Sequence, residues 1–144
     1  MKTRVLVALA ALLAAGCDTP SAIDDYTADV RLDFTARNDW AGPPETGPEL
    51  VFTGGEGEVL VEGRLTTAAP CQDITAGAVM EGGRLRLVVR VESQPGFCIA
   101  VIGRFGYTAR LLELAPGRYD LAVVHEYADN GGGTVRHETQ VTVR

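Results

Sequence analysis

Lysine is almost missing from this sequence, and serine and histidine, which many enzymes use for catalysis, are scarce. Lys2 is the only lysine among 144 residues, and the chain has two serines, Ser21 and Ser93, and two histidines. It contains no GxSxG, HExxH, CxxC or P-loop motif, so the usual patterns of nucleophilic and metal-dependent enzymes are missing. We therefore expect a protein that is not an enzyme and that carries no cofactor.

Positive charge of any kind is also in the minority. The chain has 13 Lys and Arg against 19 Asp and Glu. Without residues 1–16, a segment considered below, 11 arginines remain against the same 19 acids, a net charge of 11 − 19 = −8. Such an acidic chain repels phosphate backbones and anionic lipids. We therefore do not expect it to bind nucleic acid. The use of arginine alone fits bidentate pairing or, as we prefer, the codon usage of a GC-rich genome.

Long hydrophobic runs are absent apart from one at the N-terminus. Lys2 and Arg4 precede an apolar run of eleven residues from Val5 to Ala15. A helix that crosses a bilayer takes about 20 apolar residues, so this run is too short to span. A short apolar run behind positive charge, with small residues at its end, is typical of a secretory signal peptide.

The segment LAALLAAGCDTP, residues 9–20, ends this run at a cysteine. Its AAGC motif, residues 14–17, resembles a bacterial lipobox, with alanine where leucine is most frequent. The resemblance implies that residues 1–16 are removed and that Cys17 is lipidated, which anchors the protein in a bacterial cell envelope, facing the periplasm or the exterior. Asp18 favours inner-membrane retention in enteric bacteria only, so the choice of membrane stays open. An ordinary secreted protein is the alternative.

The two remaining cysteines predict a disulfide. We interpret residues 17–28 as the lipidated cysteine and a flexible polar tether, and residues 29–144 as one domain. Cys71 and Cys98 are then an even pair in an exported chain, which favours a bridge. It would close a loop of about 28 residues and contribute roughly 3–4 kcal/mol. A metal pair or free thiols are alternatives, but no CxxC spacing or nearby histidine accompanies the cysteines.

Apolar and polar residues alternate along most of the domain, which predicts β-strands. The expected strands cover about residues 30–36, 58–66, 72–80, 83–91, 97–103, 105–114, 119–127 and 134–144. Seven or eight short strands at this spacing predict an all-β fold, an antiparallel sandwich or a barrel. LAPGRYDLAV, residues 114–123, resembles the start of a late strand in immunoglobulin-like sandwiches, which implies that architecture.

Hairpin geometry connects the predicted disulfide with the fold. A hairpin centred on residues 81–83 places Cys71 opposite Ser93. If the next strand followed in the same sheet, the strands of Cys71 and Cys98 would lie about 9–10 Å apart. A disulfide needs Cα atoms within about 7 Å. The chain must therefore cross to an opposite sheet near SQPG, residues 93–96, or Cys71 must lie in a loop that folds over the end of the domain. Both solutions favour a sandwich.

The two histidines are the only candidate metal ligands that the sequence brings together. A last hairpin centred on Gly131 places His125 opposite His137, and Glu126 opposite Arg136 on the other face. Two facing imidazoles could hold a transition metal. No third ligand is evident, so we expect no bound metal and interpret the histidines as a polar patch.

These observations predict a non-enzymatic binding or structural module, tethered to the membrane through the lipid on Cys17, whose loops meet an envelope protein or polymer. The alternative is an inhibitor or chaperone-like module that inserts a loop, such as 38–50 or 128–133, into the cleft of a partner. Trp40 lies in the first of these loops and is expected to pack on the core, with an exposed contact residue as the alternative. The sequence does not identify the partner.

Overall fold

A computed structural model describes residues 27–39, 46–128 and 133–144, and within these ranges the chain contains strands and no helix. In this part of the chain there is accordingly no helix with the length and apolar character needed to cross a membrane. The expected signal peptide, Cys17, most of the tether, Trp40 and the tip of the last hairpin lie outside the described residues.

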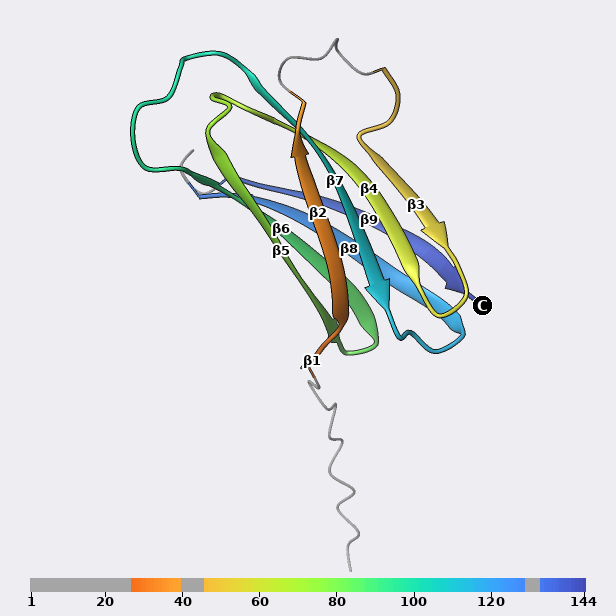
Figure 1. Cartoon of the computed structure of the whole chain (residues 1–144). Coiled ribbons are helices and arrows are strands. Elements are labelled where there is room, and N and C mark those ends of the chain that lie inside the picture. The colour runs from red at the N-terminus through yellow and green to blue at the C-terminus, as the bar shows by residue number, and fades with distance from the viewer. Residues whose placement is uncertain (1–26, 40–45, 129–132) are drawn as a thin grey trace, which may run out of the picture.

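The described residues form nine strands in two sheets that pack face to face (Figure 1). One sheet has the order β1-β5-β6-β8-β9, and the other has the order β2-β7-β4-β3. The all-β sandwich is thereby confirmed. The strands are β1 (Thr27–Asp29), β2 (Arg31–Asn38), β3 (Leu50–Gly54), β4 (Val59–Thr67), β5 (Gln72–Glu81), β6 (Arg84–Ser93), β7 (Gly103–Leu112), β8 (Gly117–Tyr127) and β9 (Gly133–Val143).

The core lies between the two sheets and follows the alternation of the sequence. β6 supplies four inward residues, β4 and β7 supply the facing layer, and β8 and β9 extend the core. Removal of these side chains from water is the main force that holds one sheet on the other. The fully buried residues of this core include Leu85, Leu87, Val89, Val59, Val61, Leu111, Leu121, Val123 and Val143.

The central strands β6 and β8 are parallel neighbours, so the expectation of a purely antiparallel fold is wrong for this pair. After Ser93 the chain leaves the five-stranded sheet, forms β7 in the other sheet, and returns as β8. Each passage reverses the direction of the chain, so the strands before and after β7 run the same way. The crossing near residues 93–96, one of the two arrangements that the predicted disulfide allowed, is confirmed, and Cys71 also lies in a loop, between β4 and β5.

Three strand predictions need correction. Residues 97–102 form no strand despite their alternation, because they lie in the crossover between the sheets, where no neighbouring strand supplies hydrogen bonds. β1 and β3, with three and five residues, were not expected. β3 lies against the edge strand β9: a Cβ added to Gly54 would lie 1.9 Å from the carbonyl oxygen of Thr142, so this approach requires glycine.

The loops gather at the two ends of the sandwich (Figure 1). The domain begins at β1, whose Thr27 pairs with Glu81, next to the β5–β6 turn. The β4–β5 loop and the β6–β7 crossover lie at the opposite end, beyond Gln72 and Ser93. The chain therefore enters the domain at one end, and the segments that contain Cys71 and Cys98 lie at the other.

Replacing both Cys71 and Cys98 by alanine should lower the free energy of unfolding by about 2–4 kcal/mol, because the bridge restricts the unfolded chain. Urea denaturation of the variant and of the non-reduced wild type measures this difference. Mass spectrometry of the non-reduced wild type should find the two cysteine peptides linked. Two alkylatable thiols in freshly isolated protein would contradict the prediction.

Candidate functional site

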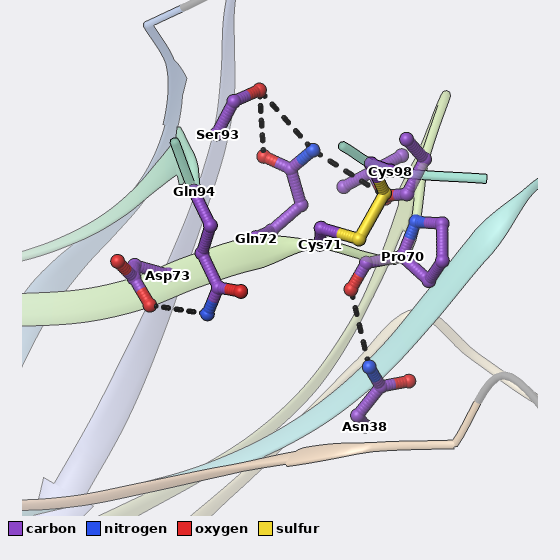
Figure 2. The surroundings of a disulfide bond; sticks show 10 residues. Asn38, Pro70, Cys71, Gln72, Asp73, Ser93, Gln94 and Cys98 are labelled. Atoms are coloured by element: carbon purple, nitrogen blue, oxygen red, sulfur yellow. Dashed lines mark hydrogen bonds between the residues drawn. A yellow bond between two sulfur atoms is a disulfide. The ribbon is translucent and has the colours of Figure 1, made fainter. Parts of the chain in front are cut away.

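The disulfide Cys71–Cys98 is present, as predicted, and joins the β4–β5 loop to the β6–β7 crossover (Figure 2). The Cα atoms of the two cysteines are 5.9 Å apart. Gln72 pairs with Ser93, so Cys71 lies opposite Gln94, one residue beyond the predicted partner. The backbone N–H of Gln94 donates to the carbonyl oxygen of Cys71 at 3.0 Å. Gln94 and Cys98, which lie on either side of Phe97 in the crossover, are therefore both attached to the β4–β5 loop.

Amide side chains fix the base of this loop (Figure 2). Gln94 Nε2 donates to the Asp73 carboxylate at 2.7 Å, and Asn38 Nδ2 donates to the carbonyl oxygen of Pro70 at 3.2 Å. Gln72 Nε2 donates to the carbonyl oxygen of Ala69 at 3.3 Å. These contacts tie the crossover and β2 to the β4–β5 loop, so the disulfide end is held by polar contacts as well as by the bridge.

The crossover itself exposes apolar side chains. Phe97 is 95% exposed and Ile102 is 64% exposed, and Ile99 and Val101 are exposed by 46% and 43%. Gly96 has a φ of +116°, a conformation that favours glycine, and with Pro95 it ends the strand and starts this segment. We call residues 94–102 the crossover loop. Its four exposed apolar side chains lie within six consecutive residues. Exposed apolar residues that are grouped in this way indicate an interaction surface more often than single, scattered ones do.

The alternation in residues 97–103 predicted a strand with one buried face, so this exposure was not expected from the sequence. The available signal was Cys98 itself: one of the two arrangements that the predicted bridge allowed takes the chain out of the sheet near residues 93–96. A segment that crosses between sheets has no strand on either side, so its apolar residues have no sheet face to pack on.

Two carboxylates lie beside the crossover loop. Asp73 and Glu92 are direct cross-strand partners on the outer face of β5 and β6, and both residues are exposed. Other glutamates on this face pair with arginines, as in Arg86–Glu81 at 3.2 Å and Arg90–Glu126 at 3.1 Å. Within the described ranges, no ion pair is found for Asp73 or Glu92. Like charges directly opposite each other in a sheet repel, so this pair favours an added cation.

The histidine register differs from the prediction. Tyr127 pairs with Gly133, so the last hairpin is centred one residue earlier than expected. His125 consequently lies opposite Val135, and His137 lies opposite Val123. The two imidazoles are diagonal neighbours on the inner face, with ring centroids 5.6 Å apart.

The predicted pair Glu126–Arg136 does not form, for the same reason. Glu126 lies opposite Thr134, and its carboxylate accepts hydrogen bonds from Arg90 on the parallel neighbour β6. Arg136 pairs with Glu138 of its own strand at 2.7 Å. The shift by one position is therefore accompanied by a different set of charge pairs.

His125 is a buried, hydrogen-bonded residue of the core. It is 3% exposed, and its Nε2 shares a hydrogen bond of 2.8 Å with the hydroxyl of Tyr107 from the facing sheet. Burial, and secondarily the proximity of His137, lowers the pKa of His125 to about 4. Burial likewise raises the pKa of the Tyr107 hydroxyl. Both partners are therefore neutral at pH 7, and the bond joins two uncharged groups.

Gly63 makes room for this contact. Tyr107 is the cross-strand partner of Gly63, and a Cβ added to Gly63 would lie 2.1–2.3 Å from atoms of the tyrosine ring. The ring therefore covers the glycine, and the hydroxyl reaches across the sandwich to His125.

A metal site at the histidines is poorly supported by this geometry. His125 Nε2 is already engaged by Tyr107, and the described residues contain no group of three or more His, Cys, Asp or Glu that could hold a metal ion. Structural zinc sites take four ligands. His137 Nε2 is buried without a hydrogen-bond partner among the described residues, but the residue as a whole is only partly buried.

A cleft of about 470 Å³ lies between the end of β4 and the edge formed by β8 and β9, beside His125 and Tyr127. Its charged walls combine acidic Asp39 and Glu49 with basic Arg64 and Arg104. Because the charges are mixed, the cleft selects neither an anion nor a cation by charge. The cleft lies at the same end of the sandwich as the disulfide, and at this end the crossover loop is the better-defined candidate surface.

Comparison of the chain with models of known protein families, with curated proteins and with solved structures finds no match. The functional interpretation therefore depends on the fold and on two places described above, the disulfide end and the contact of buried His125 with Tyr107.

Gly63→Ala should destabilise the protein by about 1–3 kcal/mol, because the new methyl group would displace the Tyr107 ring and disturb its hydrogen bond. Gly77→Ala is the matched control: a Cβ at Gly77 meets no atom within 4 Å, and alanine restricts the unfolded chain. We expect this control to be neutral or stabilising by up to about 1 kcal/mol. Chemical denaturation measures both, and equal effects of the two substitutions would contradict the assignment.

His125 should make the unfolding free energy depend on pH between about pH 6.5 and pH 4. Its pKa in the folded state is about 4, below the value of 6.5 for a free histidine, so acid protonates the unfolded state first. The stabilisation is complete above pH 6.5 and is lost as the pH falls towards 4, by about 1.4 kcal/mol per pH unit.

His125→Gln removes this titration and keeps an amide that can bond Tyr107. Denaturation curves of wild type and variant between pH 7 and pH 4 should therefore converge or cross as the pH falls. Carboxylates contribute equally to both proteins and cancel in the difference. Parallel pH dependences would show that His125 is not the titrating group.

Proposed function

We propose that this protein is a lipid-anchored, non-enzymatic module of a bacterial cell envelope that binds an envelope protein or polymer. The observation that carries the proposal is the opposite placement of two features. The domain begins at β1, beside the β5–β6 turn, and the crossover loop with its exposed apolar side chains lies at the other end (Figure 1). If the membrane anchor holds the domain at its β1 end, the crossover loop at the other end is accessible to a partner.

Dimensions support this arrangement. The ten residues from Cys17 to Tyr26 can span at most about 35 Å. β5 alone, at 3.3–3.4 Å per residue, covers about 33 Å between the β1 end and the disulfide end. Two acyl chains, with about 0.8 kcal/mol per buried methylene, are enough for stable anchorage. The lipid on Cys17 then keeps the β1 end within about 35 Å of the membrane, and the crossover loop lies at the far end of the domain from the attachment point.

We also assign the sandwich to the immunoglobulin-like type. The support is the resemblance of residues 114–123 to the start of a late strand, together with the passage of the chain from one sheet to the other at Val30, between β1 and β2. The parallel pairing of β6 with β8 departs from the antiparallel sheets of that type. A non-catalytic role is supported by chemistry at the buried histidine. His125 and Tyr107 have pKa values shifted away from neutrality in opposite directions, so neither is suited to proton transfer at pH 7.

A loop-mediated inhibitor is a second candidate, and the rigid crossover loop favours it. A loop held at both sides can occupy the cleft of a hydrolase without being rearranged. The two candidates differ in one measurement, since an inhibitor lowers the activity of the enzyme it binds and an envelope-binding module does not. A screen of envelope proteases with the purified protein separates them.

Cys17→Ala should release the protein from membranes and abolish metabolic labelling with a radioactive fatty acid, because Cys17 is the proposed site of acylation. Fractionation of cells by ultracentrifugation, with a wash at alkaline pH, measures the bound fraction. The matched control is the double variant Cys71→Ala/Cys98→Ala, which should stay with the membranes. Retention of Cys17→Ala in the membrane fraction, or release of the wild type by the wash, would refute the anchorage.

A further inference from the structure

We infer that the crossover loop inserts Phe97 into the groove of a partner protein, and that this groove has an apolar floor and a basic rim. The inference rests on the proposed function only for the orientation of the domain. It adds the residues that make the contact and the chemistry of the surface that receives them.

The apolar part of the contact comes from a side chain that does nothing for the fold. Phe97 is 95% exposed, and it is flanked in the same loop by Ile99, Val101 and Ile102, each more than 40% exposed. Aromatic side chains carry a disproportionate share of binding energy when a partner encloses them. An exposed phenylalanine in a loop of this composition fits the role of such an anchor.

The loop is ordered before it binds. Cys98, the residue after Phe97, is joined to Cys71, and the N–H of Gln94 donates to the Cys71 carbonyl oxygen. Within the loop, the N–H of Val101 donates to the carbonyl oxygen of Ile99 at 3.0 Å. A pre-ordered loop loses little conformational entropy on binding. Most of the free energy gained by burying Phe97 therefore contributes to the affinity for the partner.

Charge supplies the second half of the recognition. Asp73, near the start of β5, faces Glu92, near the end of β6 that leads into the crossover loop. Asp73 accepts a hydrogen bond from Gln94 Nε2 of the loop, and no ion pair is found for either carboxylate in the described part of the chain. Glu81, Glu126 and Glu138 on the same sheet face each have an arginine partner. An arginine or lysine on the rim of the partner's groove would relieve the repulsion between the two carboxylates.

Three other occupants fit less well. Anionic lipid is repelled by the carboxylate pair and by the acidic chain, which has 19 acids against 13 bases. A second copy would bring two such carboxylate pairs together. It would also oppose two projecting nine-residue loops, whereas a stable interface buries about 1,200 Å² or more and takes about 20–30 residues a side. The N-terminal segment enters at the opposite end of β5. A concave protein surface remains.

The partner is sought by placing the photoreactive residue p-benzoylphenylalanine at position 97 of the full chain, in the cells from which the chain comes. The same residue in place of Thr35, exposed on the outer face of β2, is the control position. We expect one protein to be crosslinked from position 97 and not from position 35. Crosslinks to a second copy or to lipid, or equal capture from both positions, would overturn the proposal.

Affinity measurements with the captured protein then test the chemistry. Phe97→Ala in the full chain, kept in detergent, should weaken binding by about 30-fold or more, the loss typical of an aromatic anchor. Val51→Ala removes an exposed apolar side chain of β3 and should change the affinity less than about twofold. Phe97→Leu keeps an apolar side chain and should retain most of the binding. An equal effect of Phe97→Ala and Val51→Ala would overturn the assignment of the anchor.

The basic rim is tested with Asp73→Asn combined with Glu92→Gln. This variant should bind more slowly than wild type and should lose most of the salt dependence of the association rate. An unchanged salt dependence would contradict a basic rim. All variants should melt within about 2 °C of wild type, because the changed side chains are exposed. Membrane fractionation of Phe97→Ala should be normal, so failure of the docking and failure of the anchorage give different results.

Discussion

The parallel pairing of β6 with β8 is the constraint on which the rest of the structure depends. Two parallel neighbouring strands cannot be joined by a tight turn. After the first strand, the chain has to run back along the length of the domain before the second strand can begin. In this protein that return path is β7, which lies in the facing sheet and turns Phe105, Ala109 and Leu111 towards the core. One connection therefore builds the centre of both sheets at once.

The same connection produces the candidate binding surface. A chain that leaves one sheet and enters the other must pass over the end of the sandwich, and there it has no strand beside it. The residues from Phe97 to Ile102 make that passage, so their apolar side chains remain in solvent. The bridge between Cys71 and Cys98 and the hydrogen bond from Gln94 hold the passage in place. Exposure and rigidity at this end thus have a common origin in the topology.

The core accommodates one polar contact, and its geometry depends on a residue without a side chain. Tyr107 lies over Gly63, and from there its hydroxyl reaches His125 of the opposite sheet. The hydrogen bond compensates two groups for the loss of water. Burial in turn lowers the pKa of His125 to about 4, so the pair stays neutral through the physiological range. His125 thus forms part of the sandwich core, and it provides a probe of the stability of that core.

The sequence was informative about two kinds of feature: the buried face of a single strand, and the pairing of the two cysteines. The alternation at Leu85, Leu87 and Val89 located the buried face of β6, and the even cysteine pair implied a bridge that is compatible with a crossing of the chain near residues 93–96. It was misleading for residues 97–103, because alternation shows which residues could face a core and not whether a neighbouring strand exists. It also placed the last hairpin one residue too far, because a run of glycines leaves the centre of a turn undefined.

By itself, then, the sequence determined the all-β class, the buried faces of the main strands and the pairing of Cys71 with Cys98. Only the tertiary structure decided that β6 and β8 are parallel, that Phe97 is exposed, that Asp73 and Glu92 face each other without an arginine between them, and that His125 contacts Tyr107. The physical reason is range. The side chains of a strand alternate between its two faces, so the buried face can be identified from a few consecutive residues. Sheet order, and exposure at the ends of the sandwich, depend on contacts between segments far apart in the chain.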